Sequence, residues 1–376
     1  MSIPFINLKA QYRRIEESVK SGIEGVLEHG AYVMGPEISE LESRLSDHCG
    51  VRHAVACSSG TDALMMALMA LEVGPGDAVF VPPFTFMATA ETVALLGATP
   101  IFVDVDPVTF NIDPDELRRR IGAVRDTRPD LTPKGVIAVD LFGQPADYDR
   151  IEPLAHNNGL FLIVDAAQSF GATYKGRSTC SLGDMACTSF FPAKPLGCYG
   201  DGGMVFTHTD ELQKLLVSIR VHGMGDDRYD NVRLGITGRL DSIQAAVLLA
   251  KFEIFEEEIG LRQQVADRYA VLLADVEGVT APSVSEGNTS VWAQYSILAR
   301  DGAHRTELLD KLKAASIPSA IYYPLPLHLQ QAFAKLGHVK GDFPVSEDLG
   351  ERIFSLPMHP YLTVEEQEAI VGALKG

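Results

Sequence analysis

The sequence has few cysteines, and their spacing excludes two common kinds of site. Five cysteines occur in 376 residues, and no two of them form a Cys-x-x-Cys pair. A disulfide framework needs paired cysteines and a zinc site needs clustered ones, so we predict no metal site. The cysteines are interpreted as small buried hydrophobic residues. Cys198 is also considered as a nucleophile, although no histidine stands close to it in the sequence.

Positive charge is also scarce. The chain has 32 Lys and Arg against 50 Asp and Glu, a formal net charge of −18. Nucleic acids and anionic membranes attract proteins with a broad positive field, so we predict neither as a partner. No apolar run is long enough to span a bilayer, and the first residues lack a basic segment followed by an apolar core. We therefore expect a cytoplasmic enzyme that acts on small molecules.

A third absence concerns the dinucleotide-binding turn. Alternating strands and helices alone would suit a nicotinamide-dependent oxidoreductase, which carries Gly-x-Gly-x-x-Gly after its first strand. This chain has Ser58-Ser59-Gly60-Thr61 at that place, and Gly200-Asp201-Gly202-Gly203 has the wrong spacing. The sequence therefore disfavours that class of enzyme.

The chain does contain a regular alternation of short apolar runs and helical patterns between residues 53 and 207. Strands are predicted at 53–57, 78–81, 101–105, 136–141, 160–164 and 204–206, and helices at 61–71, 88–96, 115–121 and 149–157. This order predicts an α/β fold with a mostly parallel central sheet covered by helices. The length exceeds one ordinary core. We expect a large domain at 1–250, beginning with a helical lead-in, and a small α+β domain at 251–376.

The C-terminal part shows a less regular pattern. Residues 240–259 predict one long helix that leads from the first domain into the second. Strands at 291–298 and 320–323 and helices at 305–315 and 364–374 follow. The lead-in is expected to pack on the large domain or on a partner subunit.

Lys194 stands inside an apolar, glycine-flanked stretch that runs from Thr188 to Gly203. An ammonium in an apolar pocket is poorly solvated, so its pKa falls and the free amine can form a Schiff base with an aldehyde. This favours pyridoxal phosphate as the cofactor. Taken alone, Lys194 would fit a surface turn better, with its stem on apolar neighbours.

A turn before the predicted helix at 61–71 has the features of a phosphate site. Gly60 permits close backbone approach, and the free amides of the first helical turn, including that of Thr61, can point at an anion. Ser189, five positions before Lys194, can add a hydroxyl. An ordinary helix cap by Ser59 or Thr61 explains the turn equally well.

Asp165 ends a predicted strand, at the edge of the sheet where such folds bind ligands. A carboxylate there can keep a pyridinium nitrogen protonated, which makes the cofactor ring an electron sink. Gln168 follows in the same turn, and Phe86, after another strand, can stack on the ring. Helix capping for Asp165 and core packing for Phe86 are the alternatives. The order of phosphate turn, aromatic, aspartate and lysine supports the cofactor.

The chain resembles the sugar-nucleotide aminotransferases of the DegT/DnrJ/StrS type, a fold type I pyridoxal phosphate family. The resemblance covers nearly the whole chain. It rests on Gly35-Pro36-Glu37, residues 59–64, Phe84-Thr85-Phe86, Asp165-Ala166-Ala167-Gln168, Ser189, Lys194, Gly238-Arg239-Leu240-Asp241 with Gln244-Ala245-Ala246, residues 323–328 and Leu356-Pro357-Met358.

The resemblance implies a role for each of these residues. Lys194 is the Schiff-base lysine and Asp165 the pyridine partner, while Gln168 contacts the ring oxygen and Phe86 stacks. Phosphate contacts are implied for Gly60, Thr61 and Ser189. Thr237 stands where many members have an asparagine that reaches the neighbouring subunit's phosphate, so a homodimer with shared active sites is implied. Lysine rather than histidine at 194 places the chain with the aminotransferases and not with the dehydratases of the family.

Substrate contacts are implied for Arg239, Tyr322, Tyr323 and His328. A basic segment, Arg220, His222, Arg228, Arg233 and Arg239, precedes the predicted long helix, and Asp226, Asp227 and Asp230 can neutralise most of it. Arg239 is the best candidate to grip a substrate anion. The tyrosine pair can alternatively pack a domain interface.

Within the family the chain most resembles the branch that aminates UDP-2-acetamido-2-deoxy-3-oxo-glucuronate with L-glutamate as donor, for a surface polysaccharide such as O-antigen. The strings at 190–203 and 252–259 carry this resemblance. Two alternatives stay open: an aminotransferase for a 3-keto or 4-keto 6-deoxy dTDP or UDP sugar, and a regulatory relative without catalysis.

Overall fold

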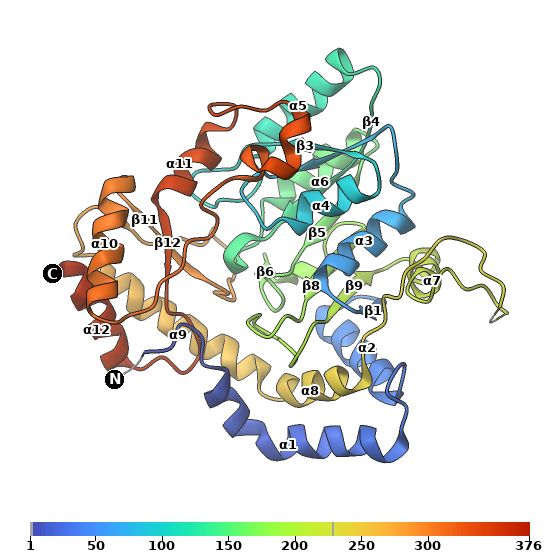
Figure 1. Ribbon diagram of the computed structural model, residues 1–376, viewed down its shortest axis with the longest axis horizontal. Coiled ribbons are helices and arrows are strands. Elements are labelled where there is room, and N and C mark those ends of the chain that lie inside the picture. Colours follow the sequence, from blue (N-terminus) through green and yellow to red (C-terminus); the bar gives the residue numbers. More distant parts are fainter. Residues whose placement is uncertain (1–2, 228) are drawn as a thin grey trace.

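The computed structural model describes residues 3–227 and 229–376. Its centre is a seven-stranded sheet (Figure 1) with the spatial order β1-β9-β8-β5-β4-β2-β3. The strands are, in that order, His53–Cys57, Gly203–Thr207, Met185–Ser189, Phe161–Asp165, Thr132–Val139, Asp77–Val81 and Thr99–Phe102. Only β9 runs against its neighbours. The predicted α/β class and mostly parallel sheet are confirmed.

Helices cover both faces of this sheet because its strands are apolar on both sides. Ala54 and Ala56 of β1 face one core cluster, and Val55 and Cys57 face another. The first cluster is closed by α2, α5, α6 and α8, and the second by α3, α4 and α7. The bounds are α2 Pro36–Cys49, α3 Gly60–Ala70, α4 Ala88–Leu95, α5 Pro114–Thr127, α6 Tyr148–Asn157, α7 Asp210–Ile219 and α8 Ser242–Phe252.

The lead-in forms α1 (Leu8–His29), which packs along α8. Ile15 and Val19 of α1 are buried against Val247 and Ala250 of α8. Just before α1, Phe5 accepts a backbone hydrogen bond from Met358. The lead-in therefore contacts both α8, which packs on the large sheet, and the C-terminal part of the chain.

The predicted long helix at 240–259 is wrong, because the chain forms two helices there. Ile254 leaves the helical conformation between α8 and α9 (Phe255–Leu273). The break lets α8 pack on the large sheet while α9 buries Val265 and Tyr269 in a separate cluster. One straight helix could not place its apolar residues in both cores.

The C-terminal part has its own antiparallel sheet of β10, β11 and β12. Its elements are β10 Val279–Thr280, β11 Tyr295–Ala299, β12 Ile353–Leu356, α10 Gly302–Ala314, α11 Pro344–Arg352 and α12 Val364–Lys375. Residues 320–323 are not a strand, because only Ala320 forms a bridge, to Ser355, and prolines follow at 324 and 326. The domain boundary near residue 250 stays a prediction.

The remaining elements are short. They are β6 Thr173–Tyr174, β7 Arg177–Ser178, and four 3₁₀ turns at Leu141–Gly143, Thr179–Ser181, Leu327–Leu329 and Gln331–Leu336. Within residues 3–227 and 229–376, no helix is both long and apolar enough to cross a membrane. The strand β8 was not predicted, although it carries Ser189 at its end.

Candidate active site

Lys194 lies in the loop that joins β8 to β9. Its amide donates to the carbonyl of Phe191 at 2.8 Å. A Cβ at Gly197 would lie 2.5 Å from the same carbonyl oxygen, so only glycine fits this tight loop. Burial lowers the pKa of Lys194 to about 8, and the nearby Asp165 carboxylate partly opposes that shift. A useful share of this amine is therefore uncharged near neutral pH.

The start of α3 lies directly against the end of β8. A Cβ at Gly60 would be 2.6 Å from the Cβ of Ser189, so the two segments approach closely and no side chain fits at position 60 unless Ser189 moves. Ser59 caps α3 by accepting the amide of Asp62 at 3.0 Å. The amides of Gly60 and Thr61, in the first helical turn, have no partner within the helix. The structure thus brings the three predicted phosphate contacts, Gly60, Thr61 and Ser189, together.

Asp165 is buried at the end of β5 and is held by two donors. The amide of Ala167 donates to Oδ1 at 3.2 Å, and Thr89 Oγ1 donates to Oδ2 at 3.1 Å. Burial raises the pKa of Asp165, while the Ala167 amide, the Lys194 charge and the Thr89 hydroxyl lower it. A further cation at this carboxylate, such as a protonated pyridine nitrogen, would be favoured.

Gln168 links the Asp165 turn to two other segments. Its Oε1 accepts the amide of Phe142 at 2.7 Å, and its Nε2 donates to the hydroxyl of Tyr323 at 3.1 Å. Tyr323 also lies edge-on to the buried ring of Phe84. Tyr322 is half-buried beside Tyr323. The tyrosine pair therefore packs between the strand-end loops and the C-terminal part, with Tyr323 joined to Gln168.

Two predicted site residues lie in different surroundings from each other. Phe86 is 58% exposed, so its ring is not a core residue and has a free face. His328 is only 2% exposed. Its Nε2 is 3.0 Å from Glu347 Oε1, and its ring packs 4.6 Å from that of Phe343. His328 is therefore enclosed by Glu347 and Phe343, and its ring is hardly accessible to a substrate.

Most described arginines of the basic segment have a hydrogen-bond or ion-pair partner in the protein, and Arg239 is the exception. Arg220 is buried and paired with Glu42, and Arg233 donates to Ser218. Arg228 lies outside the described residues. Arg239 is partly exposed, and among the described residues it has no hydrogen bond or ion pair.

The predicted neutralisation by aspartates is not what engages these arginines. Among the described residues, Asp226, Asp227 and Asp230 form no ion pair with them. Thr237 Oγ1 is 2.7 Å from Nε2 of His222. The carbonyl of Gly238 accepts the amide of Ser58 at 3.1 Å, which ties the segment of Thr237 and Arg239 to the phosphate turn.

The cysteines are free and buried, as interpreted from the sequence. Burial raises the pKa of Cys198 to about 11. Its thiol is also oriented toward the carbonyls of Phe190 and Gly200, each at 3.1 Å. A thiol with this pKa is not a nucleophile near neutral pH, so packing is its role.

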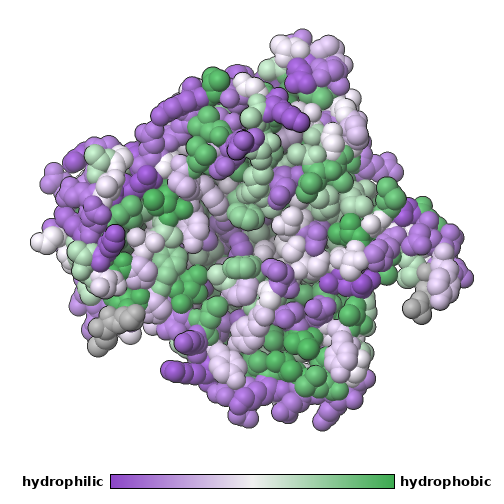
Figure 2. Space-filling view, viewed as in Figure 1, coloured by the Kyte–Doolittle hydropathy of each residue, from purple (hydrophilic) through white to green (hydrophobic). Residues whose placement is uncertain are grey.

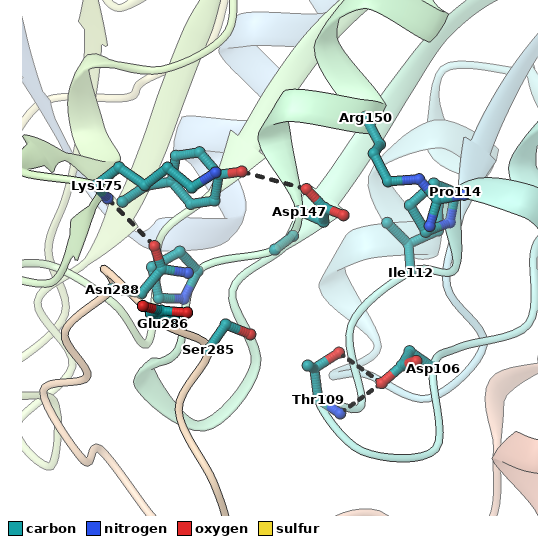
Figure 3. A pocket seen from close by; sticks show the side chains of 13 residues that line it. Asp106, Thr109, Ile112, Pro114, Asp147, Arg150, Lys175, Ser285, Glu286 and Asn288 are labelled. Atoms are coloured by element: carbon teal, nitrogen blue, oxygen red, sulfur yellow. Dashed lines mark hydrogen bonds between the residues drawn. The ribbon is translucent and has the colours of Figure 1, made fainter.

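A cavity of about 280 Å³ lies apart from Lys194 and Asp165 (Figure 3). Loops around residues 106–114, 145–150, 174–175 and 285–288 line it. Arg150 and Lys175 project toward it from opposite sides in Figure 3, and each is already paired, with Asp115 and Asp149 respectively. This cavity contains none of the predicted cofactor residues.

Comparison with known proteins agrees with this geometry. The model of the DegT/DnrJ/EryC1/StrS aminotransferase family matches residues 13–375. The chain belongs to this family. It is 49% identical to the UDP-2-acetamido-2-deoxy-3-oxo-D-glucuronate aminotransferase of Pseudomonas aeruginosa, over 99% of both chains.

Two solved structures extend the likeness of this aminotransferase to the fold. A DegT/DnrJ/EryC1/StrS aminotransferase from Brucella abortus superposes with a TM-score of 0.96 at 50% identity, covering 100% of this chain and 99% of that one. NtdA from Bacillus subtilis, solved with the bound cofactor PMP, gives 0.90 at 30% identity and covers 99% and 84%. The predicted family and fold type I are confirmed.

The aminotransferase uses pyridoxal phosphate, as predicted. Its own residues fit that group. The free backbone amides of Gly60 and Thr61 at the start of α3, beside Ser189, suit a phosphate, and Asp165 is a buried carboxylate that a pyridinium would neutralise. Lys194 supplies an amine of lowered pKa next to that carboxylate. This convergence of three chemically different groups is what the cofactor requires.

Two buried polar residues near this site were not predicted from the sequence. Thr89 donates to Asp165 from inside α4, and Asp140 lies buried at the end of β4. Both were visible as polar residues within or next to apolar stretches. Their partners are set by neighbouring strands, so their contacts could not be read from spacing along the chain.

Proposed function

We propose that this enzyme transfers the amino group of L-glutamate to UDP-2-acetamido-2-deoxy-3-oxo-glucuronate. The product would be UDP-2-acetamido-3-amino-2,3-dideoxy-glucuronate, for a surface polysaccharide such as O-antigen. The observation that carries the aminotransferase activity is the Lys194 amine, with a pKa of about 8, beside Asp165. The likeness to the Pseudomonas aeruginosa enzyme supports the particular sugar.

The charge of this substrate suits the basic segment. The sugar nucleotide carries a pyrophosphate and a carboxylate, while the protein as a whole has a net charge of −18. A local cation must therefore offset a repulsive field. Arg239 is the described member of the basic segment without a protein partner, and a planar guanidinium binds carboxylate or phosphate through two parallel hydrogen bonds. Tyr322 and Tyr323 are proposed to contact the sugar.

The proposed chemistry assigns a task to each side chain. When bound, pyridoxal phosphate supplies an aldehyde for the amine and a ring that accepts electrons. Gly60, Thr61 and Ser189 would hold its phosphate, and Phe86 would stack on the ring. Asp165 would keep a proton on the ring nitrogen.

Lys194 and Gln168 would complete the set. With a pKa of about 8, the Lys194 amine can accept a proton and return it near neutral pH. Gln168, already fixed by the amide of Phe142, would orient the ring oxygen.

We also propose a homodimer in which Thr237 and Arg239 serve the partner's site. The segment between α7 and α8 projects from the body of the molecule (Figure 1) and exposes Val232 and Leu234, the latter to 89%. Figure 2 shows hydrophobic residues gathered on the lower part of the same face, in the region of α1 and α8. Exposed apolar surface of this kind favours a protein contact. A cytoplasmic location is proposed because the charged substrates do not cross a bilayer unaided.

The substrate assignment can be tested with the cofactor as its own reporter. Glutamate should convert the visible band of the purified protein to the amine form, and the UDP-3-oxo-glucuronate should restore it. Restoration only by a 4-keto 6-deoxy sugar would replace the proposed substrate by the alternative. No response to glutamate would support a regulatory relative instead.

Shared sites can be tested by mixing two inactive variants. Lys194→Ala is expected to be inactive as a homodimer, and Arg239→Ala to keep about a tenth or less of wild-type activity at sugar-nucleotide concentrations below the KM. In a mixed dimer with shared sites, one of the two sites combines an intact Lys194 with an intact Arg239. About half of the dimers in an equal mixture are mixed, so the activity of the mixture should return to about a quarter of wild type. Absence of rescue in a mixture shown to exchange subunits would mean that Arg239 serves its own subunit.

A further inference from the structure

A second buried carboxyl lies next to the proposed pyridine partner. Asp140 follows β4, the strand beside β5, and its exposed fraction is 0%. Three donors reach its carboxylate: the hydroxyl of Tyr148 at 2.6 Å, the amide of Ala146 at 2.8 Å and the hydroxyl of Ser169 at 2.7 Å. These three donors offset the free-energy cost of burying the carboxyl group, which would destabilise the fold if it had no hydrogen-bond partner.

Asp140 is tied to the turn that carries Asp165 and Gln168. Its backbone amide donates to the carbonyl of Asp165 at 3.1 Å. Its side chain holds Ser169, the residue after Gln168. Two residues further on, the amide of Phe142 donates to Gln168. The segments 140–142 and 165–169 are therefore joined at three points.

The hydroxyl network around Ser169 can satisfy Asp140 with or without a proton. Ser169 Oγ lies 2.7 Å from Asp140 Oδ2 and 3.2 Å from Thr179 Oγ1. Thr179 donates its own hydrogen to the carbonyl of Ser169 at 3.0 Å. When Asp140 is ionised, Ser169 donates to it. When Asp140 is protonated, it can donate to Ser169, which then donates to Thr179.

We propose that Asp140 is a positioning residue: it fixes the Asp165–Ser169 turn through Ser169 and sets the charge next to Asp165. This inference rests on the proposed role of Asp165 toward the cofactor. It concerns a residue that contacts neither Lys194 nor the predicted phosphate site.

The groups that surround Asp140 disfavour its negative charge. The titratable groups that face it are Tyr148 of α6, Cys180 of the 3₁₀ turn Thr179–Ser181, and Asp165, none of which is a cation. Burial raises the pKa of Asp140 to about 7, and the charge of Asp165 adds to that shift. Asp165 has Lys194 as a counter-charge, whereas no cation faces Asp140 among these groups.

Folding stability should report the same titration without any cofactor. An acid whose pKa is raised in the folded state destabilises that state as pH rises from its unfolded value, about 4, toward its folded value. The apoenzyme should therefore lose stability between about pH 4 and pH 7 through Asp140. Asp140→Asn removes this contribution.

The experiment compares wild type with Asp140→Asn, Ser169→Ala and a control, Tyr269→Phe. The control loses a buried hydrogen bond, from Tyr269 to the carbonyl of Pro357 at 2.9 Å, in the distant C-terminal cluster. The melting temperature of each apoenzyme is measured from pH 5 to pH 8. The visible absorbance of each cofactor-loaded enzyme is titrated over pH 5 to 9.

Asp140→Asn should flatten the fall of the apoenzyme melting temperature with pH. Asp140→Asn should also lower the midpoint pH of the visible-absorbance titration by about half a pH unit, because one nearby negative charge is lost. Ser169→Ala keeps the charge, so its midpoint should stay while its affinity for cofactor falls about 3- to 10-fold. Tyr269→Phe should change neither the pH slope nor the midpoint.

An Asp140→Asn enzyme with the wild-type pH slope and the wild-type midpoint would overturn the proposal. If that variant does not fold, wild-type cofactor affinity in Ser169→Ala would overturn the positioning role. A wild-type protein without a visible band would refute the proposed function instead, and the apoenzyme slopes would still decide the role of Asp140.

Discussion

The lowered pKa of Lys194 predicts a particular pH dependence for its reaction with pyridoxal phosphate. Only the uncharged amine attacks an aldehyde, so the rate of imine formation should follow the fraction of Lys194 that has lost its proton. Burial sets that pKa at about 8 instead of 10.5. The rate should rise about tenfold per pH unit below pH 8 and level off above it.

The size of the effect follows from these two values. At pH 7 a lysine with a pKa of about 8 is about one-tenth uncharged, and one with a pKa of 10.5 is about 0.03% uncharged. Lys194 should therefore react about 300-fold faster at pH 7 than an otherwise equal lysine in water. Asp165 raises the pKa of Lys194, so Asp165→Asn should move the midpoint below 8.

Stopped-flow absorbance after mixing apoenzyme with pyridoxal phosphate measures this rate. Lys251 offers a control within the chain, because burial lowers its pKa to about 8 as well. Lys251→Met should retain the visible band, and Lys194→Ala should lose it. A rate that keeps rising up to pH 10, or an upward shift of the midpoint in Asp165→Asn, would contradict a lowered pKa of Lys194 beside Asp165.

Two further predictions concern the phosphate turn and the substrate anion. Gly60→Ala should weaken cofactor binding at least tenfold in equilibrium dialysis, because the new Cβ would lie 2.6 Å from that of Ser189; Gly122→Ala, with nothing within 4 Å, should bind normally. Arg239→Ala should raise the KM for the sugar nucleotide about tenfold or more and leave that for glutamate unchanged. Arg233→Ala, which removes a residue already bonded to Ser218, is the matched control, and an equal effect in both would argue against Arg239.

The features that follow from local sequence patterns, such as alternating strands and helices, could be predicted from the sequence. A parallel α/β sheet brings strand ends to one edge, so Asp165 and the turn at Gly60 could be placed there without coordinates. The strand β8 was missed because Met185–Ser189 contains neither valine nor isoleucine, whereas each of the other strands of the large sheet contains at least one of them. Ser189 was nevertheless named, from its position five residues before Lys194 and not from a predicted strand.

The parts that depend on contacts across the sheet could not be predicted. Thr89 meets Asp165 across 76 positions of chain, and Asp140 meets Ser169 across 29. Neither separation follows from helical or strand periodicity. The break at Ile254 likewise depends on two cores that compete for one apolar segment, which a local pattern at 240–259 does not contain.

A lowered pKa alone does not identify the reactive lysine in this protein. Lys251 is more deeply buried than Lys194, and its ammonium lies 4.4 Å from the centre of the Tyr199 ring, under the same loop. Its electrostatic neighbours are Glu258 and Cys198. Lys194 has the same pKa, but its electrostatic neighbour is Asp165, and it lies in the loop that follows Ser189, which is in close contact with Gly60. We therefore attribute the proposed reactivity of Lys194 to the surrounding groups that a bound cofactor would also contact. The Lys251→Met control separates the effect of burial on a lysine pKa from this proposed function.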